Sequence, residues 1–440
     1  MTFPIKASKK QNLAFGLLCF KSIKKRVNVI KTFSYTLFFF SFFSTFLSAE
    51  TLIHANNNPN ELIIQLNAGS SSNAAFTPVF KKFEQETGIK VIAKHFVLHN
   101  QISDSVKQHY FDISFGQNSQ RIKDLIKAGY VEPITELWNK HNFHQVFLPP
   151  ITKWLSEDNE IYGVPYSYYA WGFFIKKSVI DRYGEVPNEF KAFVRYCEKL
   201  KRAGYDIFPI SQQLKWLNTA WFEYLLLRTQ DLDFYHAVVN GEVPYTDQRI
   251  KDIFVLWHSM YAKGLFSPAY QSYNWQHTVP YILRDKLAFM FMSNNLIRRV
   301  FIKNHRDQLD FIPFPKVYDI PQLESSPTSL LFINKFSNNK EHAKRFLVFT
   351  ARPEIQSIIA EKFSSVPANI NADASYSKFA QLALSNLNKA KGFSPFYDRA
   401  VPKAFDKPSS EIFTTFLLDG DIEKAIQALE ALRLKVYLKK

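Results

Sequence analysis

Cysteine is almost absent from this chain: only Cys19 and Cys197 occur among its 440 residues. A single thiol beyond the N-terminal stretch excludes an internal disulfide and a zinc site built from several cysteines in the main part of the chain. A lipoprotein-type modification of Cys19 is also rejected, because the bulky Leu18 precedes it and Phe20 follows it. Cys197 stands among apolar residues at helical spacing, so we expect a buried structural thiol.

The local signatures of common catalytic sites are missing as well. The chain has no G-x-S-x-G elbow, no H-E-x-x-H pair, no Walker loop and no Rossmann glycine pattern. Its 11 histidines show no metal-ligand spacing. We therefore expect no catalytic residue, no metal and no cofactor. A secreted carbohydrate-active enzyme with two catalytic carboxylates far apart in the sequence would leave no such motif, and it stays open as an alternative.

After residue 49, the sequence has neither a long apolar run nor a block of basic residues. No segment there approaches the roughly 18 continuous apolar residues of a membrane-spanning helix, and no Lys/Arg-rich arm suggests a nucleic-acid partner. The net charge of +16 includes eight positive charges in residues 1–49 and no acid there, which leaves +8 for the rest. We expect a soluble mature chain, and its length favours two lobes over one core.

The start of the chain has the pattern of an export signal. Residues 1–31 carry eight positive charges and no acid, and residues 33–47 form an apolar stretch of 15 residues. Such a stretch is shorter than a bilayer-crossing helix, which needs about 20 residues. Ala49 is the first candidate for the cleavage residue and Ala55 the second. We predict a signal peptide over residues 1–49 and a periplasmic protein, with an uncleaved membrane anchor as the alternative.

Strand and helix patterns alternate beyond this signal. Strands are predicted at residues 61–66, 89–92 and 112–115. Between the first two, Phe76, Val79, Phe80 and Phe83 mark one face of a helix that Gly88 can end in a left-handed conformation. This order implies an open, mostly parallel sheet, whose ligands bind at the carboxyl ends of the strands. The polar loops at 67–73 and 116–119 should lie side by side at that edge.

Later segments give further local predictions. Residues 166–175 form an extended run rich in aromatic residues, residues 181–203 have a helical pattern, and residues 286–292 predict a strand that stops at Ser293. Asn338 can cap a helix, and Pro353 suits the first turn of the next one.

Six segments, taken in order, follow the pattern of one known family. They are residues 80–91 (FKKFEQETGIKV), 111–115 with 128–134, 162–166 (YGVPY) with 174–177, 221–228 (WFEYLLLR), 273–276 (YNWQ) and 396–399 (FYDR). Together they resemble extracellular solute-binding protein family 1, the maltose-binding type of periplasmic protein. The resemblance covers nearly all of the chain after the signal, and the YGVPY segment is its most specific part.

The resemblance implies an α/β fold of two lobes, joined by a hinge with a ligand cleft between them. It places the N-terminal lobe at residues 56–167 and 327–372, and the C-terminal lobe at residues 168–326 and 373–440. The implied function is not enzymatic. A monomer would capture a carbohydrate, a di- or oligosaccharide, and deliver it to the membrane permease of an ABC importer.

The resemblance also implies a set of ligand-binding residues. They are Gly69, Ser70, Gly116, Gln117, Ser119, Tyr169, Trp171, Trp216, Trp221, Asn294, Asn295 and Arg399. Aromatic rings can stack on the C–H faces of a sugar, and polar side chains can pair with its hydroxyls. Gly69 and Ser70 replace charged residues of the maltose binder, which argues against maltose, and Asn295 replaces an aromatic residue.

Binders of other solutes in the same family remain alternatives. A polyamine, glycerol phosphate and ferric iron each require a different set of partners. Because Tyr166, Tyr168 and Tyr169 lie close together in the sequence, ferric iron is the alternative that most needs a test.

Overall fold

The computed structural model describes residues 58–67, 70–96, 106–107, 111–270, 272, 275–297 and 302–438. The predicted signal peptide, both candidate cleavage sites and Gly69 lie outside these residues, so the predictions made for them stay predictions. Within the described ranges, no helix has both the length and the apolar character that a bilayer crossing requires.

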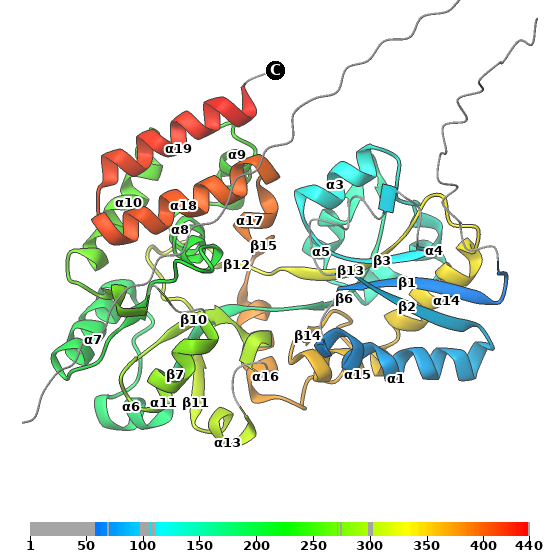
Figure 1. The fold of residues 1–440 in the computed structure, drawn as a ribbon, viewed down its shortest axis with the longest axis horizontal. Coiled ribbons are helices and arrows are strands. Elements are labelled where there is room, and N and C mark those ends of the chain that lie inside the picture. The colour runs from blue at the N-terminus through cyan, green and yellow to red at the C-terminus, as the bar shows by residue number, and fades with distance from the viewer. Residues whose placement is uncertain are drawn as a thin grey trace, which may run out of the picture. The chain divides into compact units, whose positions relative to one another are not determined.

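Six strands form the first sheet, in the order β14-β6-β13-β3-β1-β2. Their bounds are β1 (Glu61–Asn67), β2 (Lys90–Phe96), β3 (Ile113–Gln117), β6 (Val164–Tyr168), β13 (Thr328–Ile333) and β14 (Val366–Pro367). One face is covered by α1 (Ser70–Thr87), α14 (Lys340–Ala351) and α15 (Pro353–Phe363), and the other by α3 (Gln120–Lys127), α4 (Thr135–Lys140) and α5 (Pro149–Trp154) (Figure 1). This layered unit is the first lobe.

The prediction of a mostly parallel sheet is wrong for these strands. β1 is parallel to β2 and β3, but β13 is antiparallel to β3 and β6, and β14 is antiparallel to β6. The reason is the path of the chain. Between β6 and β13 the chain makes a long excursion through residues 169–327, and such a connection does not impose the parallel order that a crossover helix imposes. β14 follows β13 through α14 and α15 and lies on the other side of β6, so it runs antiparallel to β6 as β13 does.

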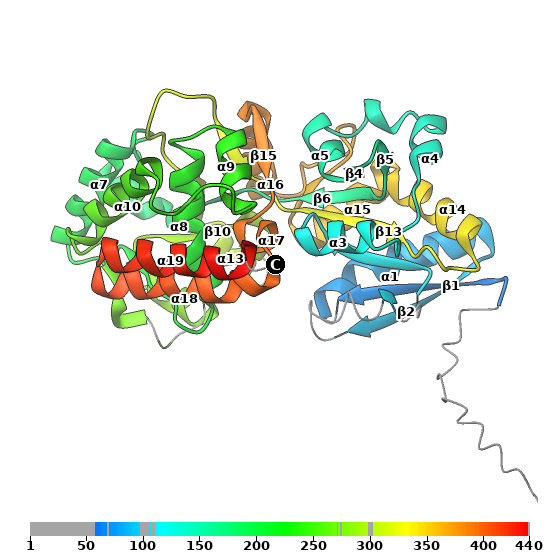
Figure 2. The ribbon, with the colours of Figure 1, turned by 90° about the horizontal axis from the view of Figure 1, so that it is seen from above.

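The second lobe is built around the three-stranded antiparallel sheet β10-β7-β11. Its strands are β7 (Trp171–Lys176), β10 (Met290–Ser293) and β11 (Leu309–Ile312), with the short pairs β8 (Phe208–Pro209) and β9 (Phe266–Ser267), and β12 (Leu323–Ser325) and β15 (Gly392–Ser394). The main helices around them are α6 (Lys177–Tyr183), α7 (Phe190–Arg202), α8 (Trp216–Leu227), α9 (Leu232–Val239), α10 (Gln248–Tyr261), α11 (Val279–Leu283), α13 (Lys303–Arg306), α16 (Lys378–Lys389), α17 (Tyr397–Ala400), α18 (Lys403–Asp419) and α19 (Ile422–Tyr437). α18 and α19 pack side by side (Figure 2).

The chain passes three times between the two lobes. β6 ends in the first sheet at Tyr168 and β7 begins in the second at Trp171; β12 ends at Ser325 and β13 begins at Thr328; and β14 is followed by α16. Several crossings that lie together are the arrangement expected of a hinge. The residue boundaries predicted for the lobes remain a proposal.

Each lobe has an aromatic core. In the first, Phe76 of α1 packs edge-on against Phe115 and Tyr166, with ring centroids 4.5 and 5.4 Å apart. In the second, the ring of Phe173 stacks on Phe291 at 4.6 Å and lies 5.6 Å from Phe314. As predicted, Cys197 is buried in the second lobe.

Of four local predictions about helices and their ends, two are confirmed and two are wrong. Gly88 follows α1 with φ of +72°, and Pro353 occupies the first turn of α15, both as predicted. The single helix expected at 181–203 is wrong, because Gly184 adopts φ of +92° after α6 and α7 begins only at Phe190. The N-cap of α14 is Asn339 rather than Asn338, one residue later than expected.

Candidate functional site

Gln117 is the centre of a polar network that joins the two lobes. It is the last residue of β3 and is half-buried. Its Nε2 donates a hydrogen bond to the hydroxyl of Tyr169, and its Oε1 accepts a bond of 2.6 Å from Nε of Arg399. The Tyr169 hydroxyl also lies 3.0 Å from Oγ of Ser329 on β13. Three predicted residues, Gln117, Tyr169 and Arg399, are thus brought into direct contact.

Two acids and a second arginine extend this network. Nη1 of Arg399 donates to Asp398 at 3.2 Å, and Arg121 at the start of α3 donates to Asp406 of α18, also at 3.2 Å. The Arg121–Asp406 pair is a second bridge between the lobes. Arg399 keeps 25% of its side chain exposed and Asp398 keeps 18%, so both can still reach a solute.

Burial dominates the electrostatics of the two acids. It raises the pKa of Asp398, although the neighbouring guanidiniums of Arg399 and Arg121 favour the charged form. It also raises the pKa of Asp406 to about 6, with the negative charge of Asp398 as a second cause. The site is therefore a group of coupled charges in partly desolvated surroundings, where hydrogen bonds to a polar solute are stronger than in water.

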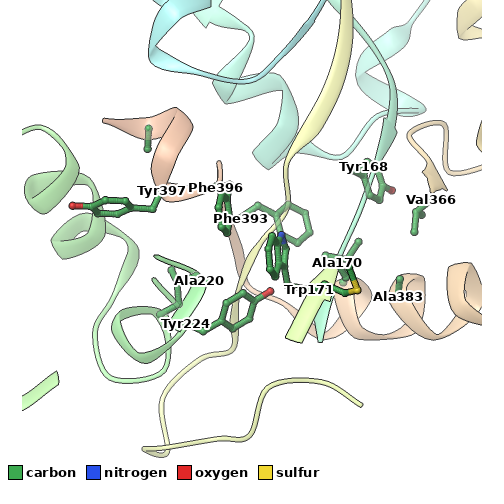
Figure 3. Close-up of a cluster of buried hydrophobic side chains, with 14 of the residues drawn as sticks. Tyr168, Ala170, Trp171, Ala220, Tyr224, Val366, Ala383, Phe393, Phe396 and Tyr397 are labelled. Atoms are coloured by element: carbon green, nitrogen blue, oxygen red, sulfur yellow. The ribbon is translucent and has the colours of Figure 1, made fainter. Parts of the chain in front are cut away.

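Trp171, Trp216 and Phe396 form an aromatic cluster in the second lobe. Phe396 is close in sequence to Arg399 of the polar network. The indole of Trp171 stacks on Phe396 with centroids 4.6 Å apart and an interplanar angle of 3°. Trp216 meets Trp171 edge-on at 5.8 Å and Phe396 at 6.0 Å. Trp171 and Phe396 are buried in the middle of the cluster (Figure 3). Of the predicted tryptophans only Trp216 is half-buried, so it is the one with surface left for a sugar ring.

Trp221 lies deeper in the second lobe than the sequence suggested. Only 3% of it is exposed, and its ring packs against Phe208 at 4.7 Å and Phe266 at 5.0 Å. It lines a small cavity of about 40 Å³ together with Asn218 and Met292. Its contacts are those of a core residue.

Asn294 and Asn295 differ from each other in their surroundings. Asn294 is fully buried: its Oδ1 accepts from the backbone N–H of Ala170 at 3.0 Å, and its Nδ2 donates to the carbonyl of Ser364 at 2.9 Å. It ties the crossing segment to the end of α15, and none of its surface is exposed to a solute. Asn295 is half-buried and accepts a bond of 2.6 Å from the hydroxyl of Ser293, so its amide group is the more accessible of the two.

The remaining predicted residues lie in the first lobe. Gly116 is packed inside it, since a Cβ there would meet Ile122 and Phe332 at 3.0 Å. Ser119 caps α3 by accepting from the backbone N–H of Ile122. Ser70 begins α1, and Gly69 lies outside the described residues. β1 and β3 are adjacent and parallel, so their carboxyl ends do meet at one edge of the sheet, as predicted.

Four members of the network were not among the residues predicted from the sequence: Arg121, Ser329, Asp398 and Asp406. Arg121 and Asp406 belong to helices of mixed charge, where nothing distinguishes them from solvent-facing residues. Ser329 belongs to β13, but its sequence neighbourhood, with several other serines, is typical of a turn. Only Asp398 could have been found from the sequence, since it stands inside the FYDR segment beside Arg399.

A family model for bacterial extracellular solute-binding proteins matches residues 67–357, more than half of the chain. This chain belongs to that family. The family predicted from the six segments is therefore confirmed.

The individual proteins that match this chain have low sequence identity to it. An uncharacterized ABC transporter extracellular-binding protein from Pyrococcus horikoshii is 24% identical over 376 residues, which is 80% of this chain and 82% of that protein. The solved structure of AcbH, a bacterial solute receptor with an exclusive preference for β-D-galactopyranose, is 19% identical with a TM-score of 0.78, and the match covers 86% of this chain and 98% of AcbH. A chitin oligosaccharide binding protein is 16% identical with a TM-score of 0.73, covering 86% and 99%. These likenesses establish the two-lobed α/β fold.

Proposed function

We propose that this protein binds a carbohydrate between its lobes and delivers it to the membrane permease of an ABC importer. The observation that carries the proposal is the contact of Gln117 with Tyr169 and Arg399. It gathers an amide, a phenol and a guanidinium from two lobes at one point. Such groups pair with sugar hydroxyls, and a solute that contacts both lobes at once favours the closed state.

Family membership and the known ligands of similar folds support this proposal. AcbH prefers a galactopyranose, and another similar structure, a cyclo/maltodextrin-binding protein, was solved with maltotetraose. The half-buried Trp216 beside the polar network supplies one stacking surface of the kind that sugars require. We infer from these features a binding protein rather than an enzyme, active outside the cytoplasm and monomeric.

Ferric iron is disfavoured by the surroundings of the tyrosines. Burial raises the pKa of both Tyr166 and Tyr168, which opposes the phenolate form that an iron ligand must adopt. The described residues also contain no grouping of three or more His, Cys, Asp or Glu side chains able to hold a metal ion. Neither observation on the described residues favours ferric iron as the solute.

The test is a thermal-shift screen of the purified protein. The panel contains D-galactose, chitobiose, xylobiose and maltotetraose beside ferric citrate, spermidine and glycerol phosphate. A ligand that binds only the folded state raises the melting temperature, by an amount that grows with its concentration above Kd. We expect a shift with at least one sugar; a shift with a non-sugar solute alone would contradict the carbohydrate proposal.

A further inference from the structure

A carboxylate buried in α8 lies behind the segment that carries Arg399. Glu223 has 0% of its surface exposed. One of its oxygens accepts a hydrogen bond of 3.0 Å from the backbone N–H of Tyr397, and the other accepts from the hydroxyl of Ser394 at 3.2 Å. The hydroxyl of Tyr235 on α9 lies 3.5 Å from the same oxygen. Two of these three partners belong to residues 394–397.

Other contacts hold the same four residues. The single O–H of Tyr235 donates to the carbonyl of Pro395 at 2.8 Å, the shorter of its two contacts. Phe396 is fixed by its stacking on Trp171, and the hydroxyl of Tyr397 bonds to that of Tyr245. Figure 3 shows Phe396 directed toward Trp171, whereas the side chain of Tyr397 points away from it.

The segment needs this support because α17 is only one turn long. It has no side-chain N-cap, and a helix of four residues is not stable by itself. Arg399, which reaches Gln117 of the other lobe, stands on this single turn. Its direction therefore depends on what fixes the residues just before it.

We propose that Glu223 is a positioning residue, which holds residues 394–397 so that Arg399, paired with Asp398, points toward Gln117 and the bound solute. An apolar side chain could fill the same space without the free-energy cost of burying a carboxyl group. The compensation for that cost is the set of hydrogen bonds to the segment. The expected effect of Glu223 on solute affinity rests on the proposed function, whereas its expected effect on the order of residues 394–397 does not.

Hydrogen–deuterium exchange of the purified protein tests this role without any ligand. Replacing Glu223 with Leu removes both acceptors, and we expect the amides of residues 394–399 to exchange about tenfold faster or more. Glu223→Gln keeps an acceptor for the Tyr397 N–H, so exchange should stay within roughly threefold of wild type. Gln356→Leu is the matched control. Gln356 is also fully buried and bonds two backbone groups, Pro165 O at 2.9 Å and Asn369 N at 2.7 Å, in the first lobe.

The proposal is overturned if Glu223→Leu leaves residues 394–399 as protected as in wild type, or if Gln356→Leu exposes them equally. Should Glu223→Leu not fold, a milder pair of variants decides. Tyr235→Phe removes the bond to Pro395, and Tyr196→Phe removes an equivalent bond of 3.0 Å to the carbonyl of Gly184 elsewhere in the second lobe. Only Tyr235→Phe should speed exchange in the segment; equal behaviour of the two would contradict the role.

Solute binding provides a separate readout. With whichever of D-galactose, chitobiose, xylobiose or maltotetraose binds the wild type, Glu223→Leu should weaken Kd by roughly five- to fiftyfold, and Glu223→Gln should restore it. If none of these sugars binds the wild type, the carbohydrate proposal is the one that fails. The exchange result still decides whether Glu223 positions the segment.

Discussion

Nε of Arg399 donates a hydrogen bond of 2.6 Å to Oε1 of Gln117, and the two residues are 282 positions apart in the sequence. Gln117 ends a strand of the first sheet, whereas Arg399 stands on the short helix α17 of the second lobe. Both have hydrogen-bonding groups that a sugar hydroxyl could use. A solute between the lobes would therefore add to, or replace, a contact that already joins them.

Removing the guanidinium should weaken binding without unfolding the protein. Arg399→Ala deletes the donor to Gln117 and a quarter-exposed side chain, so we expect a loss of about 5- to 150-fold in Kd for a bound sugar. Calorimetric titration measures this directly. Arg249→Ala is the control, since Arg249 is an exposed residue paired with Asp247 at the start of α10, and its loss should not change Kd. Unchanged affinity in Arg399→Ala would remove Arg399 from the site.

The tryptophans should separate into binding and core residues. Trp216→Ala removes the half-buried ring and should weaken Kd by about 5- to 150-fold with little change in stability. Trp257 is fully buried, and Trp221 nearly so. Replacing either with Ala should lower the free energy of unfolding by about 3–5 kcal/mol and leave the affinity of the folded fraction unchanged. Denaturant unfolding and calorimetry on the same samples make the comparison. A loss of affinity in Trp221→Ala at full folding would return Trp221 to the binding site.

The position of Trp221 illustrates what the sequence could and could not reveal. Trp216 and Trp221 are five residues apart on α8, which turns them about 140° from each other, so they cannot face the same way. Because α8 is apolar or buried nearly all round, its sequence has no amphipathic stripe to indicate which face meets the cleft. Periodicity could therefore not indicate which ring faces the cleft, because the burial of each ring depends on the strands packed around the helix.

The polar network around Gln117 could also be predicted only in part from the sequence. The FYDR and strand-end patterns led to Arg399 and Gln117 separately. Their contact could not be derived, because it depends on how the chain crosses between sheets three times. The excursion into the second lobe between β6 and β13 also explains why these two neighbouring strands run antiparallel, which alternation of strands and helices does not predict.

Glu223 should make stability depend on pH. Burial raises the pKa of this carboxyl from 4.5 to about 8. Between these values the folded protein keeps a proton that the unfolded chain releases, so the free energy of unfolding falls as pH rises through this window and levels off above it. Gln does not titrate, so Glu223→Gln should lack this part of the decline, a difference of roughly 3–5 kcal/mol.

Urea unfolding of both proteins across this pH range measures the effect. The ionisable groups that face Glu223 are Tyr235 on α9 and Asp398 on α17. The charge of Glu223 also acts on the hydroxyl of Tyr224 on α8. Asp398 and Asp406 also have raised pKa values, so some decline should persist in the variant. Parallel pH profiles for the two proteins would show that Glu223 is not the titrating group.

Export can be tested on the protein made by its native host. Mass spectrometry should find a mature N-terminus at Glu50 or Asn56, because Ala49 and Ala55 are the candidate cleavage residues after the apolar stretch. An intact Met1 in the membrane fraction would instead identify an uncleaved anchor.

Calorimetric titration of the wild type and of Gln117→Ala with the best sugar from the screen is the most direct test of a binding site between the lobes. Gln117 contacts both Tyr169 and Arg399, so its removal affects both lobes' contributions at once. We predict saturable binding of one sugar per protein molecule by the wild type, and a Kd weakened by about 5- to 150-fold in the variant. A sugar that binds the folded variant as tightly as the wild type would contradict a site at Gln117.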